Sequence, residues 1–534
     1  MHLRIIARFF ALLGVLMAGS ATWAAGRLTP YLEVQQVLDA DFNNGGDVVT
    51  YTTLAAGADG SIQNKRVQAQ MSYRYERRIP WGGSRADENV HNGVARGRAD
   101  LVRNFLALEG GAIAMRARED IRGAAPAFFT GNDDNITQVY GVYGGPDVTK
   151  KAGPLVFSGN YRFGYVKVSN KSNVVLPAGQ IPLNRFDDAT SHDASVSVGM
   201  PLGKLPFAWT VTGDYTRENA NQLDQRYTSK DVRAEVTVPV SAHLALTGSV
   251  GYESILLTER LPIRGADGFP ILNGRGRYVT DPTSPRFIAY DTDGMIWDVG
   301  AIWKPNRRTT VQARGGWRYG GRAITGSIDY QMRPNMAFRA VLYDGIDSFG
   351  RGLMRGLATL PTSFTVNRNP LTGDFGGCVF GTAPGTGSCL DDTLQSVSAA
   401  NYRNRGAYAI WSGSHGLWSF GVGGGYANHK YLAPQVSQLF NIDGVVDQSV
   451  SFEGGVTRRL SPKSDISGSV LFNWYSSGLN NAPDVTNIGA TATYTRNLTD
   501  RLIGFGAAGV YNSHTQGFGN GANGQALVGV RLQF

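Results

Sequence analysis

The last ten residues of the chain, 525–534, carry the pattern that most restricts the fold. Apolar side chains occupy every second position, and mainly polar or small residues stand between them, with Leu527 as the one apolar exception. The alternating apolar residues are Ala526, Val528, Val530, Leu532 and Phe534. Strict period-two alternation describes a β-strand with an apolar medium on one face and a polar medium on the other.

The same alternation recurs along the chain. It is clear over 67–76, 311–318 and 466–474, and the strand-like segments number about 22, within a range of roughly 18 to 24. Tight connections such as 304–307 alternate with long ones such as 345–400. Short turns at one end and long loops at the other are typical of membrane-spanning barrels.

Composition agrees with such a barrel. The chain has 534 residues, of which 69 are Gly and only 17% are charged. After the N-terminus no apolar run approaches the roughly 18 to 20 residues that a transmembrane helix needs. We therefore predict an all-β fold, a transmembrane antiparallel up-and-down β-barrel. No linker divides residues 25–534, which we expect to form one domain, and no stretch before Leu28 predicts a plug domain.

Residues 1–24 have the features of a secretory signal peptide. Arg4 and Arg8 supply positive charge, 9–17 form an apolar centre, and 22–24 (Thr-Trp-Ala) make an acceptable cleavage site. The alternative is an N-terminal membrane anchor, for which the apolar run is short. Export through a signal peptide places the predicted barrel in the cell outer membrane.

Two cysteines, Cys378 and Cys389, lie 11 positions apart in a Gly- and Thr-rich stretch. Export favours a disulfide between them, which on the chain-entropy model would stabilise so short a loop by roughly 3 kcal/mol. A pair of free thiols is the alternative. With no second Cys pair and no His cluster, the sequence predicts no metal site, and nothing in it indicates a cofactor.

The segment 345–400 is too long for a plain connection, and loops of that length are usually functional or disordered. It contains both cysteines and the basic residues Arg351, Arg355 and Arg368. One hypothesis is that it folds over or into the mouth of the pore. The alternative is an exterior loop with no contact to the barrel.

Assigning the polar face of each strand to the lumen predicts a charged pore lining. Its members are Arg74, Arg96, Arg98, Arg162, Arg233, Arg314, Arg318, Arg339, Arg531, Glu33, Glu76, Asp100, Glu235, Asp298, Asp329 and Glu453. Because a low-dielectric wall focuses the field of such groups, a basic excess would favour anions. The alternative is that these side chains pair with each other across neighbouring strands.

Catalysis and nucleic-acid binding find little support. His192-Asp193, His429 and His514 could take part in a hydrolytic site, but no serine has a GxSxG context, and we predict that the chain is not an enzyme. The run 421–425 (Gly-Val-Gly-Gly-Gly) lies in a strand-like segment, so strand glycines are favoured over a phosphate loop. The net charge of +9 includes no polybasic run, which argues against nucleic acid and for a lumen or rim location.

The signal peptide, the alternating strands and the terminal Phe534 together resemble Gram-negative, porin-like outer-membrane β-barrels. The resemblance implies contact with outer-membrane lipid and lipopolysaccharide, and recognition of the C-terminal strand, with Phe534 as the signal, by the barrel-assembly machinery. TonB-dependent transporters have a similar strand count, but the N-terminal plug expected of them is missing from this sequence.

The segments 31–36 (Tyr-Leu-Glu-Val-Gln-Gln) and 72–78 (Ser-Tyr-Arg-Tyr-Glu-Arg-Arg) are similar to an uncharacterised proteobacterial barrel group associated with exopolysaccharide and PEP-CTERM protein-sorting loci. We predict a channel for small hydrophilic solutes, anionic ones included, or for a glycan. The alternative is a closed structural barrel, or one associated with secretion or exopolysaccharide, without channel activity.

Overall fold

The computed structural model describes residues 26–42, 48–81, 88–120, 122, 135–169, 174, 176, 180, 182–381, 387–390, 397–436, 441–516 and 519–534. The proposed signal peptide, residues 1–24, lies outside these ranges. Twenty-two strands form one antiparallel sheet. They are β1 (Gly26–Asp41), β2 (Val48–Gln63), β3 (Val67–Pro80), β4 (Glu88–Val102), β5 (Leu106–Arg118), β6 (Ile136–Ala152), β7 (Leu155–Ser169), β8 (Asp188–Met200), β9 (Ala208–Ala220), β10 (Gln225–Pro239), β11 (Leu244–Glu259), β12 (Phe287–Asn306), β13 (Thr309–Arg318), β14 (Gly321–Arg333), β15 (Met336–Asp347), β19 (Asn401–His415), β20 (Trp418–Leu432), β21 (Val446–Ser461), β22 (Ser464–Ser477), β23 (Val485–Asn497), β24 (Leu502–Thr515) and β25 (Gly519–Gln533).

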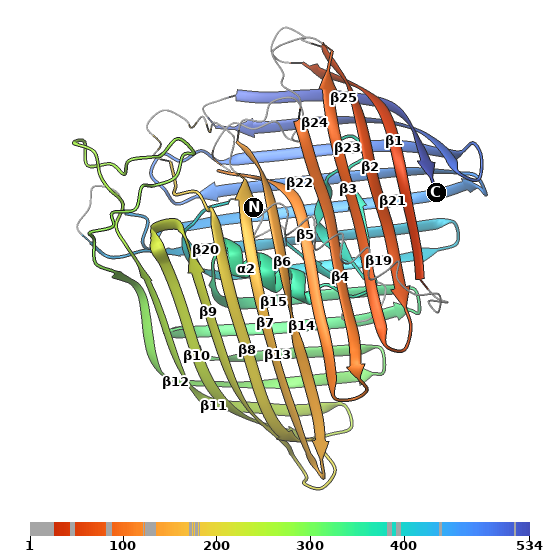
Figure 1. The fold of residues 1–534 in the computed structure, drawn as a ribbon. Coiled ribbons are helices and arrows are strands. Elements are labelled where there is room, and N and C mark those ends of the chain that lie inside the picture. The colour runs from red at the N-terminus through yellow and green to blue at the C-terminus, as the bar shows by residue number, and fades with distance from the viewer. Residues whose placement is uncertain are drawn as a thin grey trace.

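The sheet closes into a barrel because its first and last strands pair. β1 runs antiparallel to β25, with Leu32 opposite Leu532, and also pairs with β2. Each remaining barrel strand pairs with its neighbours along the chain, and β15 pairs directly with β19 across the long segment between them (Figure 1). The strand number of 22 agrees with the number expected from the alternation.

The two faces of the wall are the reverse of those in a water-soluble barrel. On β1, Leu32 and Val34 are 52% and 48% exposed, whereas Glu33 and Gln35 between them are 4% and 3% exposed. The same distribution holds on β25, where Val528 is exposed and Gln525 is buried. An apolar outer face and a polar inner face suit a wall that stands in lipid and encloses a polar lumen.

The two ends of the barrel differ in the length of their connections. The end that holds the start of β1 and the end of β25 also holds the tight turns, for example 64–66 and 307–308. The opposite end holds the long connections, among them 260–286 and 433–445. We call these the short-turn end and the long-loop end.

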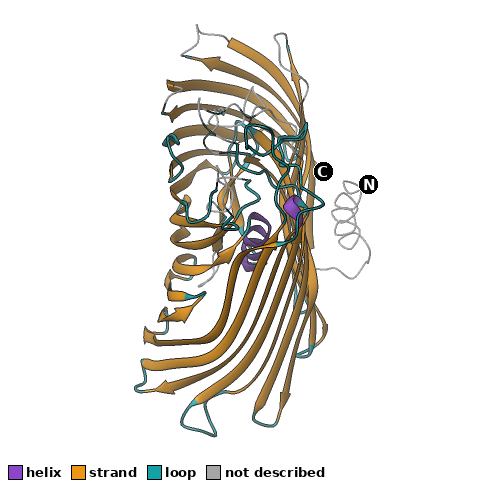
Figure 2. Cartoon of the chain, turned by 90° about the vertical axis from the view of Figure 1, so that its left-hand side faces the viewer, coloured by secondary structure: helices purple, strands orange, loops and turns teal. Residues whose placement is uncertain are grey.

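Between β15 and β19, the described residues 348–381, 387–390 and 397–400 fold inside the barrel; we call them the insertion. They form the helix α2 (Phe349–Thr359) and a three-stranded sheet of β16 (Thr365–Arg368), β17 (Phe375–Phe380) and β18 (Gly387–Cys389). Ser348 caps α2 by accepting a hydrogen bond from the Arg351 backbone N–H. Figure 2 shows the helix between the two sides of the wall. In the described part of the chain, no helix is long and apolar enough to cross a bilayer.

The insertion corrects the expected fold class. The closed antiparallel β-barrel is confirmed, but the expectation that nothing plugs it is wrong, because α2 contacts β5, β6, β7 and β8 while β17 contacts β19, β20 and β21. Of the two hypotheses for this segment, the one in which it folds into the barrel is the observed one. The physical reason is the width of a 22-stranded barrel, which leaves room for a folded segment.

Apolar packing and small wall residues hold α2 in place. Leu353 and Leu357 of the helix are fully buried and share a cluster with Ile113 and Val166 of the wall. A Cβ atom at Gly141 would lie 2.6 Å from the terminal methyl group of Met354, so a larger residue here would displace that side chain. The sequence thus forms an apolar patch on the lumen face, where alternation alone predicts polar residues.

Candidate functional site

All nine predicted lumen arginines lie on barrel strands, and each makes an ion pair. The pairs are Arg74 with Glu33 (2.7 Å) and Glu76 (2.6 Å), Arg96 and Arg162 with Glu109 (3.4 and 2.5 Å), Arg98 with Asp100 (3.6 Å) and Asp147 (3.1 Å), Arg233 with Asp298 (3.7 Å), Arg314 with Glu235 (2.6 Å) and Asp298 (3.3 Å), Arg318 with Asp231 and Glu253 (both 3.3 Å), Arg339 with Asp329 (3.7 Å), and Arg531 with Glu33 (2.7 Å). The cross-strand pairing alternative therefore describes these arginines, and their role in selecting solutes stays a prediction.

Four acidic partners in these pairs were missed by the sequence reasoning: Glu109, Asp147, Asp231 and Glu253. Asp231 shares its strand face with Arg233 and Glu235, so the alternation itself could have identified it. The one predicted acidic residue outside these arginine pairs, Glu453, accepts a hydrogen bond from the Cys378 backbone N–H at 3.0 Å. It joins the wall to the insertion.

Polar side chains tie the insertion to β3, β4 and β5. The Asp374 carboxylate forms an ion pair with Arg116 at 2.6 Å and accepts a hydrogen bond from the Asn92 side-chain amide at 3.0 Å. Arg368 donates to Asn92 at 2.6 Å, and the Gln70 amide exchanges two hydrogen bonds with the Phe364 backbone. These contacts fix residues 364–374 against one side of the lumen.

A local separation of two wall strands lets Arg116 reach Asp374. The pairing of β4 with β5 ends at Gly93 and Ala114, although both strands continue toward the long-loop end. Beyond that point the Gln138 side chain donates to the backbone carbonyls of His91 and Met115 at 2.8 Å. A side-chain amide thus takes the place of ladder hydrogen bonds at this part of the wall.

The two cysteines form the expected disulfide, which joins β17 to β18. This sheet lies against the glycine run of β20: a Cβ atom at Gly423 would stand 2.8 Å from the Cys378 sulfur. Residues 421–425 are therefore strand glycines, as expected, and their small size allows the disulfide to approach the wall.

Loops at the long-loop end pack on one another over the lumen. The side-chain oxygen of Asn184 accepts hydrogen bonds from the Tyr278 backbone N–H and from the Gln222 side-chain amide. The Tyr278 hydroxyl donates to Pro182 at 2.8 Å. Burial holds the pKa of Tyr278 well above its ordinary value, which favours the protonated hydroxyl that makes this bond.

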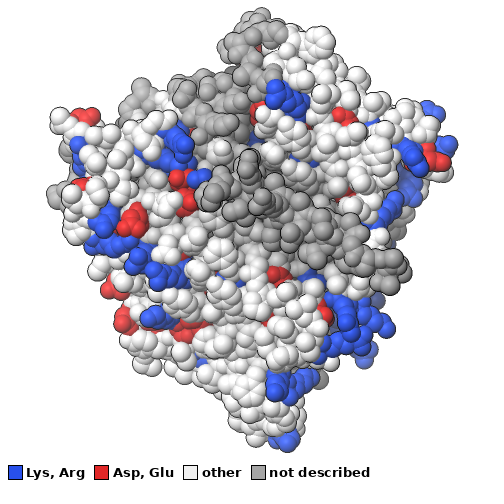
Figure 3. All heavy atoms as spheres, in the orientation of Figure 1, with Lys and Arg blue, Asp and Glu red and all other residues white. Residues whose placement is uncertain are grey.

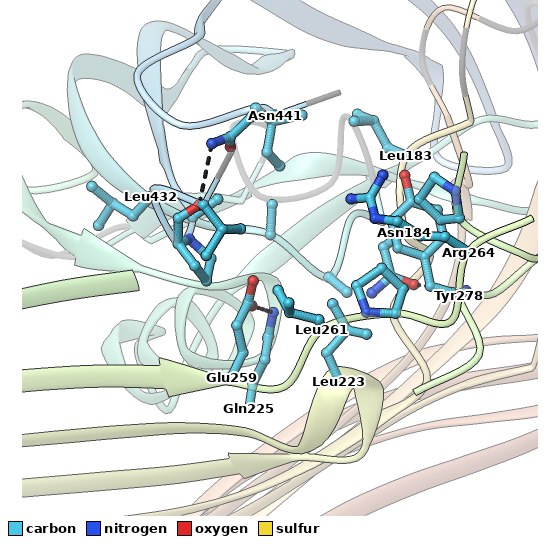
Figure 4. Close-up of a pocket in the computed structure, with 18 residues that line it drawn as sticks. Leu183, Asn184, Leu223, Gln225, Glu259, Leu261, Arg264, Tyr278, Leu432 and Asn441 are labelled. Carbon is cyan, nitrogen blue, oxygen red and sulfur yellow. Dashed lines mark hydrogen bonds between the residues drawn. The ribbon is translucent and has the colours of Figure 1, made fainter. Parts of the chain in front are cut away.

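Figure 4 shows a small pocket among these loops, with Glu259 and Gln225 hydrogen-bonded at 2.6 Å and Asn441 donating to the Pro434 carbonyl. Its volume is about 70 Å³, and Leu183, Leu223 and other apolar side chains line much of it. A cavity of this size holds at most a few waters. The pocket is a packing feature of the loops and has no room for a solute.

A larger cavity lies at the short-turn end, between the insertion and the wall. Its volume is about 660 Å³, and it is bounded by β1 to β3, by β23 to β25, and by residues 364–373 of the insertion. Polar side chains predominate among those that line it, and they include Arg74 and Arg531 from the predicted lumen set. This cavity is the candidate functional site.

Basic residues surround the same end of the barrel. Fifteen exposed Lys and Arg lie in or beside the short turns, where the acidic residues are Asp100, Asp465 and Asp500. They are Lys65, Arg66, Arg103, Lys150, Lys151, Lys204, Lys304, Arg307, Arg308, Arg333, Arg458, Arg459, Lys463, Arg496 and Arg501. We call them the basic rim. Figure 3 shows part of the basic rim as blue atoms along the lower and right-hand edges. The rim accounts for the net positive charge of the chain.

The histidines considered for catalysis do not come together. His192 lies on β8 and bonds the Tyr161 hydroxyl, whereas His429 on β20 stacks on Tyr402. His514 lies on β24, and no backbone ladder joins these three strands to one another among the described residues. Within the same residues, no group of three or more His, Cys, Asp or Glu side chains is placed to bind a metal ion.

A closed barrel with an apolar exterior, a polar lumen, short turns at one end and long loops at the other is a transmembrane barrel of the outer-membrane class. The chain is therefore an outer-membrane β-barrel protein, and it resides in the outer membrane of a Gram-negative bacterium. In this class the short turns face the periplasm and the long loops face the exterior.

Solved structures with a similar barrel include two iron-uptake proteins and a further receptor. The ferric-catecholate import receptor Fiu of Escherichia coli is 10% identical, with 94% of this chain and 81% of that chain covered and a TM-score of 0.45. The FrpB iron transporter of Neisseria meningitidis is also 10% identical, covering 94% and 82%, with a TM-score of 0.47. The ferric preacinetobactin receptor BauA of Acinetobacter baumannii is 10% identical, covering 95% and 81%, with a TM-score of 0.46. No family model matches the chain, and no curated protein matches its sequence.

Proposed function

We propose that the protein is an outer-membrane channel for small hydrophilic solutes, anionic ones included, and that the insertion closes its lumen in the observed state. The supporting observation is the polar cavity of about 660 Å³ that remains between the wall and the insertion. Cavities of roughly 300 to 1,000 Å³ are of the size that binds small molecules. The chemistry is passage and recognition, and no residue is assigned to catalysis.

The two parts of the insertion are attached in different ways. α2 buries Leu353 and Leu357 in an apolar cluster, so its removal from the wall would expose apolar surface to water. Residues 364–374 are held by hydrogen bonds and by the Asp374–Arg116 ion pair. Because water can replace hydrogen bonds at a net cost of about 0.5 to 1.5 kcal/mol each, we propose that this polar part moves when the channel opens.

Conductance in a planar bilayer tests the proposal. The wild-type chain is compared with a variant in which a flexible Gly/Ser link replaces residues 361–396, so that α2 and the outer loops remain. We expect a larger steady conductance from the variant. Heat-modifiability on a gel serves as the control for a folded barrel, and an unchanged conductance in folded protein would contradict the proposed channel.

A closed barrel associated with secretion or exopolysaccharide is the second candidate. The packed outer loops and the insertion together favour it, since both obstruct a route through the lumen. If neither the wild-type chain nor the variant conducts ions in the planar bilayer, the closed barrel is favoured over the channel.

Two further proposals concern export and assembly. Residues 1–24 are proposed as the cleaved export signal, and N-terminal sequencing of the mature protein should then begin at Ala25. Phe534 is proposed as the signal for the barrel-assembly machinery: it ends the chain beside β1, 62% exposed, with its backbone N–H bonded to Pro30. Phe534→Ala should slow assembly in cells while refolding in detergent proceeds normally.

A further inference from the structure

The cavity at the short-turn end has an excess of positive charge at its surface. Four arginines line it, Arg27, Arg74, Arg368 and Arg531, against two carboxylates, Glu33 and Asp59, so the formal balance is 4 − 2 = +2. Glu33 is shared, because Arg74 and Arg531 both approach it at 2.7 Å. These three groups, together with Glu76 at 2.6 Å from Arg74, form one paired cluster on the wall.

The other two arginines have no such partner. Arg368 of the insertion donates to the Asn92 side chain at 2.6 Å, to the Gly373 carbonyl at 2.9 Å and to the Ser72 hydroxyl at 3.0 Å, all of them neutral acceptors. Arg27 of β1 is exposed and, among the described residues, makes no ion pair. Asp59, the remaining carboxylate, accepts a hydrogen bond from Ser72 at 2.6 Å.

Neutral polar and aromatic side chains complete the lining. Hydroxyl and amide groups come from the wall, including Thr29, Ser61 and Gln533, and the rings of Phe364 and Phe505 come from the insertion and β24. Guanidinium groups bind carboxylates through two parallel hydrogen bonds. Hydroxyl and amide groups complement the hydroxyls of a sugar, and aromatic rings offer it an apolar contact.

We infer that this cavity is a binding site for a small hydroxylated carboxylate, of the chemical class of the sugar acids, with Arg27 and Arg368 as the groups that bind its carboxylate. Arg27 belongs to the wall and Arg368 to the insertion, so the bound anion bridges the fixed and the proposed movable part of the lumen. The basic rim at the same end raises the local concentration of anions that arrive from the periplasm. The inference rests on the proposed channel function only for the route by which the solute enters.

Equilibrium binding to the intact, detergent-solubilised protein tests this site. Digalacturonate is the acidic probe, and maltose, a neutral disaccharide, is the matched control; both are titrated by calorimetry at low and high salt. We expect digalacturonate to bind at least about 10-fold more tightly than maltose and to weaken as salt rises. Equal binding of the two sugars, or no binding of digalacturonate, would overturn the inference.

Substitutions locate the site. Arg27→Gln and Arg368→Gln should each weaken digalacturonate binding roughly 10- to 100-fold, the effect of removing a hydrogen bond to a charged group. Arg275→Gln, an exposed residue of the 260–286 connection at the long-loop end, is the control and should leave binding unchanged. Among the described residues no hydrogen bond or ion pair joins Arg27 to the insertion, so equal affinities for the Arg27 and Arg275 variants would reject the site. Because binding is measured without conductance, a conducting protein that fails to bind digalacturonate would retain the channel and lose only this site.

Discussion

At the long-loop end, arginines are buried and hold carboxylates: Arg185 lies 2.8 Å from Glu119, and Arg277 lies 2.5 Å from Asp187. At the short-turn end the arginines and lysines of the basic rim are exposed, and none makes an ion pair within the described residues. The same residue type therefore orders the outer loops at one end and forms a positive field at the other. In Figure 3 the two charge signs are mixed on the left-hand side, and blue predominates along the lower edge.

The energetic difference between the ends follows from solvent. Breaking a buried pair leaves a charge without hydration, which typically costs about 3 to 5 kcal/mol. An exposed charge keeps its water, and pairs between exposed groups contribute about 0 to 1 kcal/mol. Substitutions that remove one guanidinium should therefore have large effects toward the long-loop end and small ones at the short-turn end.

The largest effect is expected from Arg116→Met. Arg116 is 4% exposed and pairs with Asp374 and Glu88. Its loss removes the cation beside the Asp374 carboxylate, whereas Glu88 keeps Arg78 at 3.1 Å. The free energy of unfolding, measured by urea titration of the refolded barrel, should fall by roughly 3 to 5 kcal/mol. Arg98→Met is the matched control: its side chain is 40% exposed, and the change should be under about 1 kcal/mol. Equal losses would remove the distinction between the ends.

The second largest loss of stability is expected from Val470→Arg, which tests which face of the wall strands stands in lipid. Val470 is 49% exposed on the outer face of β22, where an arginine would stand in lipid and lower the stability by about 2 to 4 kcal/mol. Ser469 faces the lumen side and bonds Thr491 at 2.6 Å, so Ser469→Arg should be much milder. A heat-modifiability series on both variants decides the register, and a larger loss for the Ser469 variant would reverse the two faces.

Arg277→Ala should loosen the long-loop end. Its guanidinium bonds Asp187 at 2.5 Å and the Val168 carbonyl at 3.4 Å, and removing such contacts typically costs about 1 to 3 kcal/mol. Limited proteolysis of intact cells should then cleave the 260–286 connection faster than in the wild type. Arg275→Ala removes an exposed side chain from the same loop and should leave the cleavage rate unchanged. Similar rates for the two variants would show that the pair does not order the loop.

The smallest effect is expected at the basic rim. Arg307 and Arg308 are exposed in the turn between β12 and β13, so the double variant Arg307→Gln/Arg308→Gln should change the stability by no more than about 0.5 kcal/mol. Urea titration under the conditions used for the Arg116 variant provides the comparison. A loss of several kcal/mol would mean that the rim supports the fold.

Particular residues show where sequence reasoning succeeded and where it failed. The alternation in 466–474 identifies both the strand β22 and its lipid face, because side chains on a strand necessarily alternate between two faces. It also found lumen charges such as Arg314, but it could not say which carboxylate each one would meet. That depends on the register between strands, here Gly300 opposite Arg314, which a single strand does not specify.

The insertion is the larger omission. Phe349, Leu353 and Leu357 stand four residues apart, a spacing that predicts one face of a helix and was open to recognition. The sequence could not show where that helix lies, because the wall against which it packs is assembled from strands far away in the sequence. Gly141 and Gly164, which give Met354 its room, belong to β6 and β7, about two hundred residues before the helix.

The sequence by itself determined the barrel: periodicity, turn residues and the two-faced strands are local properties, and they require lipid outside and polar groups within. The tertiary structure alone decided what the lumen contains. Whether Arg368 and Arg27 line the same cavity, and whether the arginines of the wall are neutralised, depends on distances between residues hundreds of positions apart. Those distances exist only after the sheet has closed and the insertion has packed inside it.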